Sequence, residues 1–463
     1  MLFDQKKINT LILISFIFSS FLSIYYLSKY DKYSEYNKDN HPMIKIAVQN
    51  HWHEAQIILD DIRDGKKFWE AGKKSTDSFL PQKILALFYY AIDEELEENG
   101  KTKVQNGKAY YLIFKSLLYY FLLYLLSKKL FLTFPKQNVF FTILFLALIP
   151  DLFQYHSSFW NESIFFSIQL LLIYFFLDNS QKFLNNLFIG FVVGLMYSVS
   201  EEYFIYIFFL TIIYILNFKA KFLKPILGLI IGYAMMLTII FLSNNFKGRS
   251  DKIVAYGIKS ALYIYLAPNI LSEQKKISLN EANENLKKEA INWAINKNIN
   301  YEDNSYLLIK INNLDDNEKY LNYIFKKSLQ IVFSNPTVTF KHIINSSLHT
   351  ITLNPFYINY FYQHDGKGEF LKTNKHKKLI PVRIIYSIIV YLIILLGFLK
   401  FLKKKNRSLN VFLILSILYV ILSLGWMGNP RYFTPALIFM SFFFGNFFNF
   451  SNDSLYKVNK FNT

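Results

Sequence analysis

The chain has 463 residues, of which 53% are hydrophobic and 19% aromatic, and a formal net charge of +18. Its 48 Phe and 34 Tyr residues are more than a water-soluble domain of this length buries. Because cysteine is absent, a disulfide framework and a thiolate metal site are excluded. The apolar residues form blocks of about twenty, which is the length that crosses a bilayer. The sequence therefore predicts an all-α, multi-pass membrane protein.

The first apolar block, "INTLILISFIFSSFLSIYYLSKY", follows Lys6 and Lys7. It is longer than the apolar region of a typical signal peptide, and no small-residue cleavage motif follows it. We therefore expect a retained first span, followed by nine more. The ten predicted spans are 8–28, 108–128, 138–156, 159–178, 184–200, 203–218, 224–244, 380–400, 409–425 and 432–449.

Basic residues are distributed unevenly between the short connections. One set of connections carries Lys128, Lys129, Lys136, Lys182, Lys219, Lys221, Lys224, Lys400, Lys403, Lys404, Lys405 and Arg407. The other set carries Asp151, Glu201 and Glu202, with Arg431 as its one strong base. The positive-inside rule assigns the first set, and both termini, to the cytoplasm. The high net charge thus reflects lysines at helix ends, and no nucleic-acid partner is expected.

Two long polar segments, 29–107 and 245–379, then fall on the extracytoplasmic side. They divide the chain into an N-terminal transmembrane module (1–244), an extracytoplasmic helical segment (245–379) and C-terminal transmembrane helices (380–463). In the first segment, Trp52, Ala55, Leu59 and Ile62 recur at helical spacing. This pattern predicts an amphipathic helix that ends near Gly65 and lies along the membrane surface.

The second polar segment contains two predicted helices. "SLNEANENLKKEAINWAI" begins with Ser278 and Glu281 in the spacing of a capping box. Its apolar stripe, which we interpret as core packing, consists of Leu279, Ala282, Leu286, Ala290 and Trp293. Another helix is predicted to begin near Pro336, because proline suits a first helical turn.

Ionisable residues at the ends of spans are candidates for function, because burying them in a membrane is costly. Asp151 and Glu162 flank His156 in "DLFQYHSSFWNES", at the predicted outer ends of the third and fourth spans. A purely structural interpretation is also open: the polar residues before Glu162 could cap a helix, whose dipole favours an acid in the first turn. Glu201 and Glu202 fit solvated residues of a tight turn.

The first polar segment also contains histidines. His41, His51, His53 and Glu54 do not have the spacing of a known metal motif, so we expect no metal site there. A requirement for a divalent metal stays open.

Arg431 lies at the predicted outer start of the last span, in "GNPRYFTPAL". A guanidinium at headgroup depth can hold a phosphate group through two hydrogen bonds. Tyr432 has the position of an aromatic at the membrane interface. The alternative is that Arg431 simply extends toward lipid headgroups.

Several of these motifs occur in one order. They are "HEAQIILDDIRDGKKFW", "SFLPQKILALFYY", "HSSFWNES", "GFVVGLMYSVSEEY", "SNPTVTFKHIINSSLHTITLNPF" and "GNPRYFTPAL". In this order and topology the chain resembles the GT-C superfamily of glycosyltransferases, which use sugars linked to polyprenyl phosphate. It is most similar to the bacterial branch with protein O-mannosyltransferases and lipid A aminoarabinose transferases. The resemblance implies an enzyme of the bacterial inner (plasma) membrane.

The resemblance also implies a reaction. A sugar would pass, with inversion, from an isoprenoid-phosphate donor to a lipid, glycan or protein acceptor on the extracytoplasmic side, without a resident cofactor. A carboxylate would accept the proton of the acceptor hydroxyl, and cations would stabilise the departing phosphate. The implied site residues are Glu54 or Asp31 as general base, Glu162 or Asp151 as a second acid, and Arg431, Tyr432, His156 and His53 as substrate-binding groups.

Two features depart from the family pattern, and the first is that the turn "SVSEEY" lacks the arginine that relatives often show. The other is Ala47, which stands where relatives carry an aspartate shortly after the first span. An inactive relative that binds lipid-linked sugar is therefore the first alternative. The second is a transporter or flippase of a lipid-linked substrate, which intramembrane carboxylates and broken spans would suit, although the chain has no repeated halves.

Overall fold

The computed structural model describes most of the chain as helices. The described residues are 3–34, 55, 58–68, 71, 79–92, 106–157, 162–178, 182–199, 201–218, 221–246, 259–260, 262–302, 309, 311, 313–351, 353, 374–402, 407–424 and 433–449. The chain divides into two compact units. The first consists of Met1–Gly248, Leu353–Ile417 and Thr434–Thr463, and the second of Arg249–Thr352 and Leu418–Phe433. The three-region division of the sequence stays a prediction.

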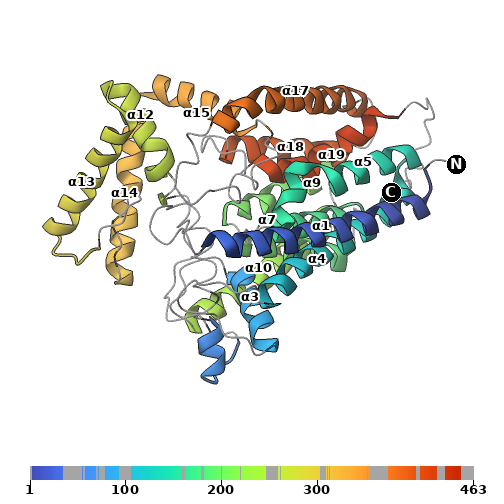
Figure 1. Ribbon diagram of the computed structural model, residues 1–463, viewed down its shortest axis with the longest axis horizontal. Helices are drawn as coiled ribbons and strands as arrows, with labels where there is room; N and C mark the ends of the chain where they lie inside the picture. Colours follow the sequence, from blue (N-terminus) through green and yellow to red (C-terminus); the bar gives the residue numbers. More distant parts are fainter. Residues whose placement is uncertain are drawn as a thin grey trace. The chain divides into compact units, whose positions relative to one another are not determined.

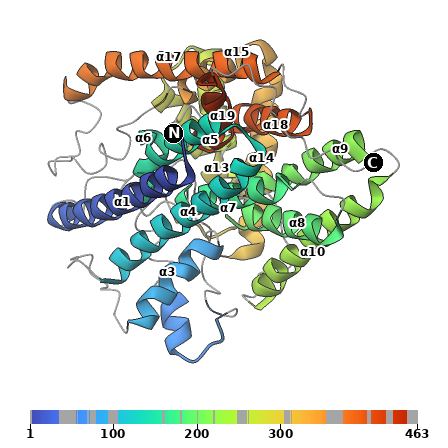
Figure 2. The same cartoon turned by 90° about the vertical axis from the view of Figure 1, so that its right-hand side faces the viewer.

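The first unit is a helical bundle (Figure 1). Its elements are α1 (Gln5–Ser34), α3 (Phe79–Ala91), α4 (Asn106–Thr133), α5 (Lys136–Leu148), α6 (Pro150–Phe153), η1 (Gln154–Ser157), α7 (Glu162–Phe176), α8 (Phe183–Val199), η2 (Glu201–Ile205), α9 (Tyr206–Phe218), α10 (Leu223–Phe246), α17 (Asn374–Leu402) and α19 (Thr434–Phe447). Helix α18 (Arg407–Leu424) belongs to it up to Ile417. Helix α4 packs against both α1 and α7 (Figure 2).

Several helices of this bundle are long and apolar enough to cross a membrane. Among the described residues there are four: Gln5–Tyr25, Ala109–Thr133, Leu223–Ile240 and Ile380–Leu402. A fifth span is possible if Lys136–Leu148 and Pro150–His156, which meet at 45°, count as one. Five shorter apolar helices accompany them: Glu162–Phe176, Phe183–Val199, Tyr203–Leu216, Ser408–Ile421 and Thr434–Phe447. The chain is therefore an α-helical, membrane-embedded protein, and the number of ten spans stays a prediction.

The bend between α5 and α6 has a local cause. Ile149 has an extended backbone (φ −60°, ψ 122°) and Pro150 begins α6. A residue before proline avoids the helical region because the proline ring would collide with it. The third predicted span is thus interrupted seven residues before His156.

Helices α8 and α10 lie side by side and touch at backbone level (Figure 2). The contact uses glycines four residues apart on each helix: Gly190 and Gly194 on α8, and Gly228 and Gly232 on α10. A Cβ atom at Gly190 would lie 2.0 Å from the carbonyl oxygen of Leu229, and one at Gly232 would lie 1.9 Å from that of Leu187. Small residues that allow such approach are typical of helix pairs in membranes.

A second close crossing joins α5, α17 and α19. A Cβ atom at Gly397 would lie 1.9 Å from the carbonyl oxygen of Phe443. Beside it, Asn446 donates from Nδ2 to the carbonyl oxygen of Gly397 (2.9 Å), and its Oδ1 accepts from Nδ2 of Asn138 (3.2 Å). Interhelical side-chain bonds of this kind also contribute to helix association in lipid.

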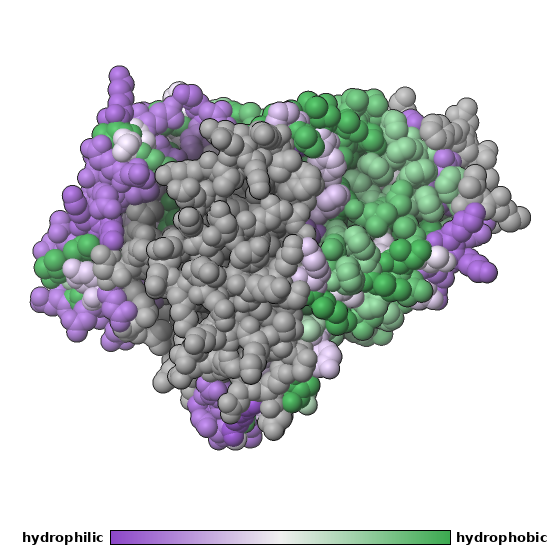
Figure 3. All heavy atoms as spheres, in the orientation of Figure 1, coloured by the Kyte–Doolittle hydropathy of each residue, from purple (hydrophilic) through white to green (hydrophobic). Residues whose placement is uncertain are grey.

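The exterior of the bundle is apolar. Exposed side chains include Leu13, Ile14, Ile17 and Phe21 on α1, and Ile384, Ile385, Ile388 and Ile389 on α17. In Figure 3 the described surface of the bundle is largely green, whereas that of α12–α14 is largely purple. This distribution suits contact of the bundle with lipid.

The predicted surface helix of the first polar segment is described in part. Residues 58–63 are helical, and Ala55 and Leu59 are fully buried, which confirms an apolar face. Gly65 (φ +82°) ends the helix as predicted, since Lys66 N donates to Asp61 O and Gly65 N to Ile62 O. Trp52 lies outside the described residues.

The second unit contains a π-helical turn, η4 (Leu262–Leu266), and helices α12 (Ala267–Lys275), α13 (Leu279–Asn296), α14 (Leu314–Ser334) and α15 (Pro336–Thr350). The predicted stripe of α13 is mostly confirmed: Ala282, Leu286 and Ala290 are fully buried, and Trp293 stacks on Tyr323 with ring centres 4.9 Å apart. The prediction was wrong for Leu279, which is 44% exposed. Leu279 is the first residue of α13 and precedes the turns that pack against the core.

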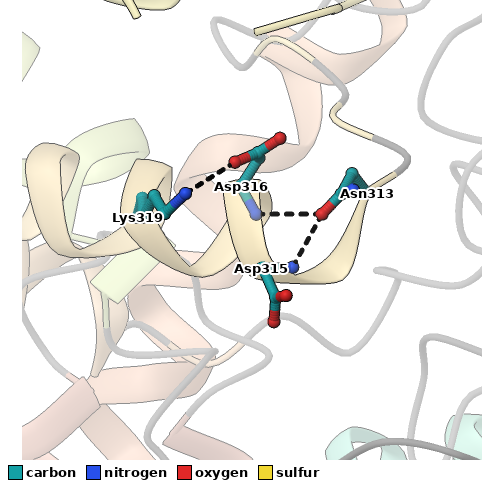
Figure 4. A network of polar contacts seen from close by, with 4 residues as sticks. All are labelled: Asn313, Asp315, Asp316 and Lys319. Carbon is teal, nitrogen blue, oxygen red and sulfur yellow. Dashed lines mark hydrogen bonds and ion pairs between the residues drawn. The ribbon is translucent and has the colours of Figure 1, made fainter.

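The helix starts in this unit use side-chain caps. Ser278 Oγ accepts a hydrogen bond from Glu281 N (3.1 Å), so the predicted cap of α13 is confirmed. Asn313 caps α14 by accepting from the backbone N–H groups of Asp315 (3.0 Å) and Asp316 (3.2 Å) (Figure 4). Helix α15 begins at Pro336, as predicted.

Candidate functional site

Three of the predicted site residues lie close together in the chain and are described with their contacts: Asp151, His156 and Glu162. Asp31 lies in α1, but its side chain is not described. The other four, Glu54, His53, Arg431 and Tyr432, lie outside the described residues, so their roles stay predictions.

Asp151 lies in the first turn of α6 and is buried. Pro150 positions it there by starting a new helix after the break at Ile149. Tyr386 of α17 donates its hydroxyl to Oδ2 of Asp151 (2.8 Å), and Tyr391 of the same helix interacts with Asp151 electrostatically. The structure thus ties this carboxyl group to α17.

His156 is fully buried in η1, between three helices. Its ring lies against Tyr119 of α4, with centres 4.4 Å apart, and its Nδ1 is 2.6 Å from the hydroxyl of Ser163 in α7. Ser23 of α1 donates to its carbonyl oxygen (3.5 Å). Within the described part of the chain, no hydrogen-bond partner reaches its Nε2. The imidazole is therefore fixed in place and retains one nitrogen that no described group bonds.

Lys115 is the functional candidate that the sequence analysis missed. It lies in α4, is fully buried, and has its ammonium group 5.2 Å from the ring centre of Tyr111. It interacts electrostatically with Glu162 and with His156. The signal was present in the sequence, since Lys115 falls inside the predicted span 108–128, where a charge is unusual.

Lys115, His156 and Glu162 form what we call the buried polar centre, in which the first two side chains are fully buried and Glu162 is half-buried. They come from α4, η1 and the start of α7, and α4 contacts both other elements. Glu162 is the first residue of α7, where the helix dipole stabilises its negative charge. An ammonium group, a carboxylate and an imidazole in a site of low polarity can bind an anionic group and exchange a proton.

Serine side chains connect α1 to this centre. Ser15, Ser19 and Ser23 recur four residues apart on α1 and are all buried. The hydroxyls of Ser19 and Ser116 of α4 lie 3.1 Å apart, and Ser116 follows Lys115 directly. Small polar side chains permit close helix packing in membranes, so this interface sets the position of Lys115.

In the regions whose placement is described, no three His, Cys, Asp or Glu side chains come together as metal ligands.

Comparison with known proteins gave no relative: no family model, no curated protein and no solved structure matches this chain. The likeness to GT-C glycosyltransferases accordingly rests on the sequence motifs alone.

Proposed function

We propose that the protein is a membrane glycosyltransferase that moves a sugar from a polyprenyl-phosphate donor to an extracytoplasmic acceptor. The observation that carries this proposal is the buried polar centre of Lys115, His156 and Glu162. Ionisable groups inside a membrane bundle are costly and usually mark a functional site. Two of the three residues also belong to the motif "HSSFWNES" on which the family resemblance depends.

The chemistry of such a transfer uses groups of both signs. The acceptor oxygen attacks the anomeric carbon, the bond from that carbon to the phosphate oxygen breaks, and the phosphate leaves with the electron pair. Lys115 and Arg431 would stabilise the charge of the leaving phosphate. Glu54 or Asp31 would accept the hydroxyl proton, with Glu162 or Asp151 as the second acid.

The proposal includes an orientation. The lysine-rich connections and both termini lie on the cytoplasmic side of a bacterial inner membrane. The start of α4 then lies on the extracytoplasmic side. Lys115 follows the first residue of α4 by nine positions, which corresponds to about 14 Å along a helix. A lipid-linked phosphate near the outer headgroups could therefore approach this lysine from the outer side.

Two alternatives have specific support. The bend at Ile149 resembles the interrupted helices of transporters, which favours a flippase of a lipid-linked substrate. Ala47, in the place of the family aspartate, favours a relative that binds the donor without turning it over.

The direct test is single-turnover transfer from a radiolabelled polyprenyl-phosphate sugar in membranes. The wild type should consume the donor. The transfer rate of Arg431→Ala should be lower by about 100-fold or more, as expected for removal of one charge-stabilising group. Glu54→Gln tests whether the carboxylate of Glu54 is the general base. Lys128→Ala, an exposed lysine at the other end of α4, is the control and should retain activity.

Each negative outcome has a distinct meaning. Full turnover by Arg431→Ala would remove the arginine from the mechanism. A wild type that binds donors of a broad panel but consumes none would favour the inactive relative. Movement of intact donor across liposomes would favour the transporter.

A further inference from the structure

Helix α15 exposes an apolar strip, although it belongs to the unit with a polar surface. The strip consists of Phe340, Ile344 and Leu348, which are 66%, 43% and 58% exposed and lie four residues apart. Phe333, in the last turn of α14, is 75% exposed. Residues spaced by four lie along one face of a helix, so Phe340, Ile344 and Leu348 form one apolar strip on α15.

The other two faces of α15 are also distinct. Thr337, Lys341 and Asn345 form an exposed polar strip beside the apolar one. The inward face packs against the second unit: Ile343 contacts its core, and Thr339 Oγ1 donates to Val332 O (2.8 Å). The helix therefore buries some polar groups while it exposes three large apolar side chains.

The chain itself keeps the C-terminal end of α15 close to the candidate span of α17. Leu353 N donates to Ser387 Oγ (3.1 Å), and Arg383 Nε donates to Leu353 O (3.5 Å). Both partners lie in the candidate span Ile380–Leu402. Leu353 follows the last residue of α15, Thr350, by three residues, which reach at most about 11 Å. This covalent limit holds for every orientation of the second unit.

The charge of the segment suits a phospholipid surface. From Gln330 to Thr350 the sequence contains no Asp or Glu, one lysine and two histidines. Lys341 forms an ion pair with Glu273 of α12 (2.6 Å), and no acidic residue of α15 itself lies beside the apolar strip. The carboxylate of Glu273 is thus paired with Lys341, and α15 itself contributes no carboxylate that would repel lipid phosphates.

We propose that α15 lies in the bilayer interface, with Phe340, Ile344 and Leu348 inserted among the lipid headgroups and upper acyl chains. The adjoining strip of Thr337, Lys341 and Asn345 faces water. This is the arrangement of an amphipathic interfacial helix, whose apolar side enters the lipid by roughly 5–10 Å. The helix would anchor the second unit at the membrane, and this role is independent of the transfer activity.

The absence of cysteine allows a direct test in the full-length chain. Single variants Ile344→Cys and Asn345→Cys place a nitroxide label on adjacent, exposed positions of the two strips. Ile388→Cys on α17 is the lipid standard and Lys319→Cys on α14 is the aqueous standard, since both positions are exposed. Labelled protein in nanodiscs of phosphatidylcholine and phosphatidylglycerol is then compared for collision with oxygen and with a water-soluble nickel chelate.

We expect the label at Ile344 to collide with oxygen more than with nickel, as at Ile388. The label at Asn345 should favour nickel, as at Lys319. If the label at Ile344 collides with nickel as much as the one at Lys319, the strip faces water and the proposal is wrong. If it is immobile and reached by neither reagent, protein covers the strip, and the proposal is equally wrong.

Discussion

The two units place their polar and apolar groups in opposite ways. The bundle exposes apolar side chains and buries ionisable ones, including Lys115, Asp151 and His156. The unit of α12–α15 exposes most of its charged residues and buries an aliphatic and aromatic core. In water, burial of apolar surface drives helices together. In lipid that gain is absent, so close packing and polar contacts take its place.

Two helix pairs make this contrast concrete. Helices α8 and α10 meet through glycines, with backbone against backbone. Helices α13 and α14 meet through large side chains, such as Trp293 on Tyr323. The stability of the bundle should therefore be most sensitive to substitutions that enlarge a side chain. The stability of the second unit should be most sensitive to substitutions that shorten one.

The largest effect is expected for Gly232→Leu in α10. A Cβ atom there would lie 1.9 Å from a carbonyl oxygen of α8, which cannot move without moving the helix. We expect a cost above the roughly 1–3 kcal/mol that is typical of overpacking, and loss of monodisperse protein. Size-exclusion chromatography and thermal unfolding in detergent measure this effect.

The matched control is Ala234→Leu, two residues further along α10 at an exposed position. It should behave like the wild type. If Gly232→Leu is as stable as this control, α8 and α10 do not touch at backbone level.

The next largest effect is expected for Leu286→Ala in α13. Leu286 is fully buried, so its truncation should cost about 2–5 kcal/mol. Leu279→Ala, on the same helix but 44% exposed, should cost less than about 1 kcal/mol. Hydrogen exchange of α13 in the full-length protein measures both locally. Equal protection in the two variants would show that α13 does not pack through Leu286.

The smallest effect concerns His342 in α15. Partial burial lowers the pKa of this imidazole, while Glu273 opposes the shift. A lowered pKa in the folded state means that the unfolded chain binds the proton first as pH falls. The contribution of neutral His342 to folding stability is therefore complete above about pH 6.5 and is lost in more acidic solution.

His342→Gln tests that sign. At pH 8 the variant and the wild type should differ by about 0.5 kcal/mol or less. At pH 5 the wild type should lose more protection of α15 from hydrogen exchange than the variant does. A larger loss of protection at pH 5 in the variant than in the wild type would contradict a lowered pKa of His342.

Much of the fold was predictable because its causes are local. The apolar blocks, the cap at Ser278, the start at Pro336 and the end at Gly65 each depend on a few neighbouring residues. The close backbone contacts at Gly190 and at Gly232 could not be predicted, since they depend on which helices pair. The charge of Lys115 within a predicted span was visible in the sequence, but its partners Glu162 and His156, more than forty residues away, were not. His156 and Glu162 could be named as candidates because one motif carries both.

A double-mutant cycle on Lys115 and Glu162, with thermal stability and sugar transfer recorded together, tests whether the buried polar centre serves catalysis. Lys115→Met alone leaves a carboxylate without this cation, and we expect a cost of about 3 kcal/mol. Lys115→Met with Glu162→Gln removes both charges, so stability should return to within about 1 kcal/mol of the wild type. If the two charges take part in catalysis, the rate of sugar transfer by the double variant should remain about 100-fold or more below that of the wild type. A stable double variant with wild-type transfer would show that the buried polar centre is structural and has no part in sugar transfer.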